Sequence, residues 1–122
     1  MTAVKYMLMM FGDQATMLAT RSSEWITTMI EFMERTSSEL VESGELVEGQ
    51  GLVDPSLART VRIRADHPVV TDGPFAESKE SLAGYWVLEC DDARAIDVAS
   101  RCVAVTGEPV EVRQVMDAPA QV

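Results

Sequence analysis

Two segments of the chain are apolar on both of their alternating faces, and this pattern limits the folds that the chain can adopt. Residues 4–11 read VKYMLMMF, and residues 83–90 read AGYWVLEC. Successive side chains of a strand point to opposite faces of a sheet, so each segment places apolar groups on both faces. Such strands need cover on both sides. We therefore expect helices on one face of the sheet and a second protein surface on the other.

Residues 23–43 have the spacing of a long amphipathic helix. Ser22 or Ser23 can cap its first turn. Glu24 complements the positive end of the helix dipole, and Gly44 can end the helix. The stripe at helical spacing comprises Trp25, Met29, Phe32, Met33, Thr36 and Leu40. The aromatic and methionine members of this stripe are more typical of a hydrophobic core than of a cofactor site.

A second helix is predicted after residue 90. Asp91 or Asp92 can cap it, and it should run to about Val103. Its inward residues are expected to be Ile96, Ala99, Cys102 and Val103.

Four further segments read as strands, at residues 45–52, 59–65, 69–72 and 109–116. The first, ELVEGQGL, runs into a glycine-rich turn and lacks the third glycine, the lysine and the following helix of a phosphate-binding loop. The second, RTVRIRA, alternates, with Val61, Ile63 and Ala65 on one face. The third can be a separate strand or half of a hairpin.

This order of elements predicts an α+β fold with two helices on one face of a mostly antiparallel sheet. The 122 residues fit one domain, which we take to cover residues 1–122. Two helices cover only one face, so a second copy of the same sheet is the simplest cover for the other. The strand pattern therefore predicts a homodimer joined sheet to sheet.

Charge and composition exclude several classes of function. Acidic residues outnumber basic ones by 20 to 10, and the formal net charge of −10 repels nucleic-acid backbones and anionic lipid surfaces. The apolar run near residue 4 is too short for a signal peptide or a membrane span. Cys90 and Cys102 form no CxxC pair, and with one histidine, His67, no metal site is expected. Reduced thiols without an export signal favour the cytoplasm.

The stretch TDGPFAESKESLAGYW, from Thr71 to Trp86, resembles the signature of the DGPF branch of the YCII-related proteins. The usual pattern there is close to TDGPFAETKEQLGGYY. Other matching segments follow in the expected order: KYMLMMFGD, EGQGL, TVRIR and VEVRQVM. The resemblance covers nearly the whole chain.

This resemblance implies a ferredoxin-like fold of the dimeric α+β barrel type, with two sheets packed face to face. In another branch, a helix histidine and an aspartate have been proposed as an acid–base pair. Here His67 lies in the predicted polar turn ADHP and not on the first helix, so that role is not carried over. A related branch includes a dehydrochlorinase of chlorinated hydroxyquinols. DGPF-type proteins are also often associated with sigma factors of the extracytoplasmic-function type.

Asp72 is the candidate catalytic residue. Gly73 and Pro74 can form a rigid turn that aims its carboxylate, which could then act as a general base or bind a cation or hydroxyl group. Alternatively, Asp72 accepts backbone N–H groups and only builds the turn.

The candidate ligand-binding residues are Arg62, Arg64, Glu77, Lys79, Glu80, Tyr6 and Tyr85. Arg62 and Arg64 lie two residues apart on one strand face, an arrangement that suits a carboxylate or phosphate ligand. They could instead pair across the sheet with Glu111, Glu89 or other acids. The charged residues that follow the signature can shift the pKa of a nearby carboxylate or form a solvated loop, and the tyrosines can line a pocket or the core.

Two functions remain open. The chain can be a small-molecule-binding or regulatory accessory protein linked to sigma-factor-type transcription control. Alternatively, it is a cofactor-independent enzyme that performs proton transfer, elimination or lyase-type chemistry on a small, possibly anionic substrate, with Asp72 as its base. The first is favoured because no nucleophile with a base is visible.

Overall fold

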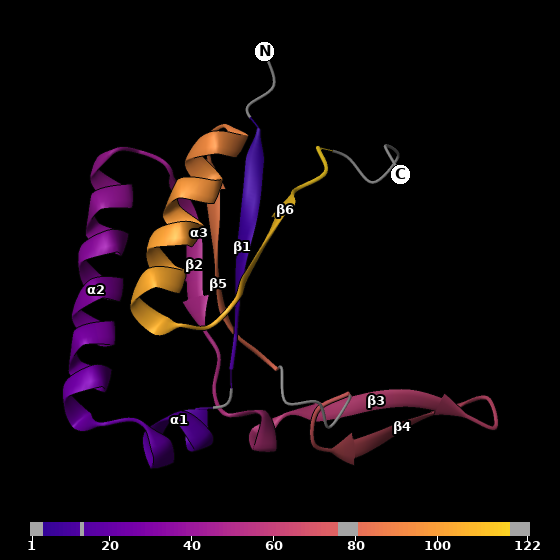
Figure 1. The fold of residues 1–122 in the computed structure, drawn as a ribbon. Helices are drawn as coiled ribbons and strands as arrows, with labels where there is room; N and C mark the ends of the chain where they lie inside the picture. The colour runs from indigo at the N-terminus through magenta and orange to yellow at the C-terminus, as the bar shows by residue number, and fades with distance from the viewer. Residues whose placement is uncertain (1–3, 13, 76–80, 118–122) are drawn as a thin grey trace.

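A four-stranded antiparallel sheet with two helices on one face forms the body of the protein (Figure 1). The structure, a computed structural model, describes residues 4–12, 14–75 and 81–117. Its elements are β1 (Lys5–Phe11), α1 (Gln14–Thr20), α2 (Ser23–Glu42), β2 (Leu46–Gly51), η1 (Pro55–Leu57), β3 (Arg59–Arg64), β4 (His67–Asp72), β5 (Leu82–Glu89), α3 (Asp92–Thr106) and β6 (Val110–Gln114). The α+β prediction is confirmed. None of the helices in these ranges is long and apolar enough to cross a membrane.

The two doubly apolar segments occupy the centre of the main sheet, whose strand order is β2-β5-β1-β6. β1 pairs antiparallel with β5 on one side and with β6 on the other, and Leu8 lies opposite Trp86 and Val112. β5 also pairs with β2. β1 and β5 are therefore the two central strands, and neither lies at an edge of the sheet.

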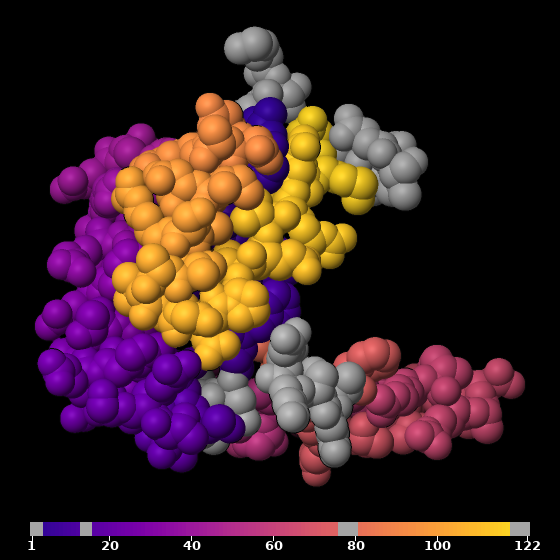
Figure 2. All heavy atoms as spheres, viewed as in Figure 1, coloured from indigo at the N-terminus to yellow at the C-terminus, as the bar shows by residue number. Residues whose placement is uncertain are grey.

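The β3–β4 hairpin forms a separate two-stranded sheet that projects from the body and leaves an open notch beside β6 (Figure 2). Ala65 and Asp66 make its two-residue turn with positive φ angles of 49° and 65°. The predicted loop position of His67 is therefore wrong, because the tight turn allows His67 to pair with Arg64 as the first residue of β4.

Local capping explains where the helices begin and end. The Ser22 hydroxyl accepts a hydrogen bond from the Trp25 N–H at 3.0 Å, and Asp91 caps α3 through the Arg94 N–H at 2.8 Å. Gly107, with φ of 73°, ends α3 in the left-handed conformation. The helix consequently runs three residues beyond the predicted Val103.

The inward stripe of α3 differs from the predicted one. The residues that are buried are Ala95, Val98, Ala99 and Cys102. Ile96 and Val103 are 48% and 41% exposed, so their predicted inward position is wrong. The four buried residues follow i, i+3, i+4, i+7 spacing, which places Ile96 and Val103 on the flank of the helix.

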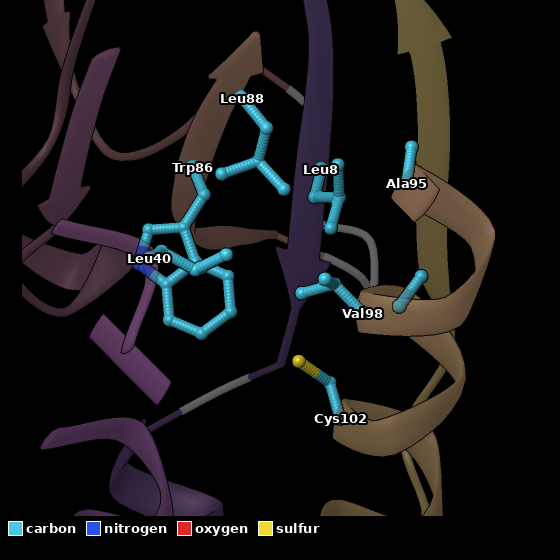
Figure 3. Packing of buried hydrophobic residues seen from close by; sticks show 8 residues of the cluster. Leu8, Leu40, Trp86, Leu88, Ala95, Val98 and Cys102 are labelled. Atoms are coloured by element: carbon cyan, nitrogen blue, oxygen red, sulfur yellow. The ribbon is translucent and has the colours of Figure 1, made fainter. Parts of the chain in front are cut away.

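The core lies between the sheet and the α2–α3 layer (Figure 3). Its largest fully buried side chains are Leu8, Leu40, Leu88, Val98 and Cys102. Phe32 and Met33 of α2 pack against this cluster, as the predicted stripe requires. Cys90 and Cys102 are both free thiols, as expected.

A cluster of charges joins α2, β2 and α3 on the outside of the helix layer. Arg94 donates to Glu45 at 3.0 Å and also contacts Glu39 and Asp97. Arg101 bridges the same Glu39 and Asp97. The hydrogen bond from Arg94 holds the pKa of the Glu45 carboxyl below its usual range. This network holds the two helices side by side over the sheet.

A truncation in the core tests this packing. We expect Leu88→Ala to lower the free energy of unfolding by about 2–5 kcal/mol, because it leaves a cavity at a fully buried site. Leu18→Ala on α1, where the side chain is 66% exposed, is the matched control and should change it by under about 0.5 kcal/mol. Chemical denaturation measures both, and equal losses would contradict the assigned core.

Candidate ligand-binding site

The predicted Asp72 turn lies where the hairpin returns to the body. Gly73 has φ of 103°, a conformation that favours glycine. Its N–H donates to the Ala58 carbonyl at 2.7 Å, and its carbonyl accepts the Thr60 hydroxyl at 2.8 Å. The Asp72 side chain is exposed and, within the described residues, makes no hydrogen bond or ion pair. Backbone contacts and Thr60 therefore hold this turn.

The two arginines lie on the hairpin face opposite Asp72, which shares its face with Arg59. The Arg62 guanidinium donates to the Phe75 carbonyl at 3.0 Å and lies 5.4 Å above the Phe75 ring. The alternative pairing of Arg62 and Arg64 with Glu111 or Glu89 is wrong. Those acids belong to the main sheet, whereas the hairpin is a separate one.

The other predicted ligand residues are not brought together. Tyr6 packs against the core on the helix side of the sheet. Tyr85 donates its hydroxyl to Glu48 at 2.8 Å, and this hydrogen bond raises the pKa of Tyr85. The three charged residues that follow the signature lie outside the described residues: Glu77, Lys79 and Glu80. Their predicted role remains a prediction.

A cavity of about 350 Å³ lies between the helix layer and one end of the sheet. Trp25, Met29 and Met33 of α2 form one wall. The sheet contributes Met10 and Trp86. Met17 of α1, Phe11, Cys102 and Val110 complete the apolar lining. The α2 stripe was interpreted as plain core, but its first half faces this cavity.

Two closely packed glycines, Gly49 and Gly84, lie in the sheet wall of the cavity. A methyl group at residue 49 would lie 2.5 Å from Cδ1 of Trp86, so the indole occupies the space above Gly49. A methyl group at residue 84 would lie 2.9 Å from the Gln50 carbonyl oxygen. The segments EGQGL and AGYW therefore carry the signal for this cavity, as glycines opposite a large aromatic. By their pattern alone, these segments predict only a strand with a glycine-rich turn and a second strand.

An ion pair lies at the rim of the cavity. The Arg21 guanidinium contacts the Glu108 carboxylate at 3.2 Å and stacks 4.7 Å above the ring of Trp25. Both charged side chains are partly exposed, whereas Trp86 and Cys102 on the inner wall are buried. The pair links the start of α2 to the loop between α3 and β6, residues that are distant in sequence.

The described lining of the cavity is largely apolar, and its thiol is buried. Burial raises the pKa of the Cys102 thiol to about 11, so it is protonated at neutral pH and a poor nucleophile. Across the described ranges, no group of three His, Cys, Asp or Glu residues is placed to hold a metal ion. The cavity therefore offers apolar contact, and the ion pair at its rim is its charged feature.

We expect Gly49→Ala to lower the free energy of unfolding by about 1–3 kcal/mol, because the added methyl group forces Trp86 to move. Gly51→Ala on the same strand is the control, since a methyl group there meets no atom within 4 Å. Thermal unfolding and tryptophan emission measure both effects. An unchanged emission spectrum in Gly49→Ala would contradict the close contact.

Comparison with known proteins gives one family. The model of the YCII-related domain matches residues 4–119 of this chain. An uncharacterized protein of Rhizobium meliloti (strain 1021) is 44% identical over 50 residues. That alignment covers 41% of this chain and 40% of the relative, less than half the length of either.

Proposed function

Because the chain belongs to the YCII-related domain family, we propose that it is a homodimeric, small-molecule-binding protein whose ligand occupies the helix–sheet cavity. The cavity carries this proposal: its size is within the range of small-ligand sites, and its lining is largely apolar. On the basis of the TDGPF resemblance, we also propose that the protein is cytoplasmic and has an accessory role in sigma-factor-type transcription control. The two free thiols agree with that compartment.

We further propose that the fold is ferredoxin-like with an inserted hairpin. The succession β1-α2-β2-β5-α3-β6 follows the βαββαβ pattern of that fold. The hairpin interrupts it between β2 and β5.

The proposed dimer uses the sheet face away from the helices. Met7 lies opposite Val87, and Met9 lies opposite Tyr85, all four by alternation on this face. The hairpin adds an apolar surface, because Val61, Ile63 and Val70 are 63%, 69% and 59% exposed. A second copy of the chain, placed in the notch beside β6, would cover both surfaces (Figure 2).

Substitution on the hairpin tests the dimer. In sedimentation velocity at micromolar concentration, we expect wild type to be a dimer and Ile63→Asp to dissociate, because a buried carboxylate would disrupt the apolar contact. Ile96→Asp is the control: it adds the same charge on the outer flank of α3, and the dimer should persist. A monomeric wild-type protein would overturn the proposed assembly.

The enzymatic alternative, with Asp72 as general base, is not favoured by the geometry of the single chain. Asp72 lies on the opposite hairpin face from Arg62 and Phe75, and it does not line the helix–sheet cavity. An enclosed site in which these three groups converge would have favoured catalysis. The exposed turn instead agrees with a role in binding or assembly.

A ligand screen by thermal shift can show whether a ligand binds in the helix–sheet cavity or at the Asp72 turn. At a concentration of about 100 times its Kd, a ligand should raise the Tm of wild type by roughly 10 °C. Met29→Trp fills the cavity and should abolish the shift. Ile30→Trp, on the exposed side of α2, is the matched control and should keep it.

The variant Asp72→Asn tests the Asp72 turn as the alternative ligand site in the same thermal-shift screen. We expect the shift to persist in this variant, because Asp72 is not part of the cavity. Loss of the shift in Asp72→Asn with its retention in Met29→Trp would move the ligand to the Asp72 turn and overturn the proposed site.

A further inference from the structure

The walls of the cavity are unusually rich in methionine. Met10, Met17, Met29 and Met33 reach it from a strand and two helices. Methionine thioethers are flexible and polarizable, and they make favourable contacts with aromatic rings. Such walls adapt to the outline of a ring and do not select an extended polar ligand.

The described lining of the cavity offers no free charge to compensate a charge on its ligand. Among the described residues that line it, Glu108 is the one that carries a charge, and its carboxylate already faces Arg21. The Thr106 hydroxyl is also engaged, since it donates to the Cys102 carbonyl and accepts the Glu108 N–H. A buried ion without a counter-charge is strongly disfavoured. The rise in the pKa of Cys102 through burial agrees with this, because it reports an environment that disfavours an anion.

Two indoles bound the space from different layers. Trp25 comes from α2 and Trp86 from β5, so a planar ligand between the helix and the sheet would contact aromatic surface on both sides. Offset or edge contacts between rings stabilise such pairs beyond simple burial. Arg21 covers the Trp25 ring at the rim and leaves the inner wall to the ligand.

Resting on the proposed function, we propose that the ligand of this cavity is an uncharged, ring-bearing small molecule, and that the Arg21–Glu108 ion pair excludes charged analogues by neutralising both charges at the rim. The Arg21–Glu108 ion pair thus sets the preference for an uncharged ligand. Removing one partner leaves the other charge free to attract an ion of opposite sign.

Four probes test the ligand class by calorimetry: 2-naphthalenemethanol, 2-naphthoate, 2-naphthylmethylammonium and 1-undecanol. The first three share one ring system and differ in charge, and the last has the same carbon number as the first without a ring. We expect the neutral aromatic alcohol to bind at least tenfold more tightly than either ion. It should also bind several-fold more tightly than undecanol.

Two rim variants test the neutralisation. Glu108→Gln leaves Arg21 unpaired and should strengthen naphthoate binding by about tenfold, with little change for the alcohol. Arg21→Gln leaves Glu108 unpaired and should strengthen binding of the ammonium probe instead. Unchanged selectivity in both variants would overturn the role assigned to the ion pair.

The outcomes distinguish the ligand class from the site. Absence of binding by all four probes, in wild type and Met29→Trp alike, would count against the cavity as a ligand site and therefore against the proposed function. Binding that Met29→Trp abolishes, but with naphthoate, the ammonium probe or undecanol as the tightest ligand, would overturn the ligand class and leave the site in place.

Discussion

The antiparallel pairing of β1 with β5 is the constraint on which the other layers depend. These strands are the two central strands of the main sheet, and each is apolar on both faces. On the helix side, Leu8 and Leu88 pack against α2 and α3 through Leu40 and Val98. On the other side, Met7 and Met9 are half-buried on an apolar face that α2 and α3 do not cover, whereas Val87 on the same face is already buried in the single chain. One pair of strands thus determines both the core and the proposed dimer face.

The cavity arises because the side chains between the helices and the sheet differ in size from one end of the sheet to the other. Near Leu88, aliphatic side chains fill the gap, but towards the other end the sheet carries Gly49 and Gly84. The Trp86 indole lies over Gly49, and Gly84 on the neighbouring strand carries no side chain. The resulting cavity of about 350 Å³ lies within the size range of small-ligand sites.

Much of the fold could be predicted from local patterns, because caps and alternation act over a few residues. Local patterns predict the helix caps at Ser22 and Asp91 and the two doubly apolar strands. Other features depend on contacts distant in sequence. α1 has only seven residues, too few to show a helical period. The alternation of Val61 and Ile63 predicts a strand, but not that this strand lies on a projecting hairpin with both side chains exposed. The cavity was missed because its walls come from α1, α2, α3 and the sheet together.

The position of the TDGPF segment separates the most recognisable motif of the chain from the helix–sheet cavity. Gly73 ties the end of β4 to Ala58 and Thr60 at the start of β3, so the segment fixes the base of the hairpin rather than a pocket wall of that cavity. A hairpin with an exposed apolar face can cover a second copy only if its base is rigid, because a freely moving arm would lose conformational entropy on docking. Under this interpretation, the motif serves assembly through the backbone geometry of Gly73, while ligand recognition lies with Trp25, Trp86 and the methionines.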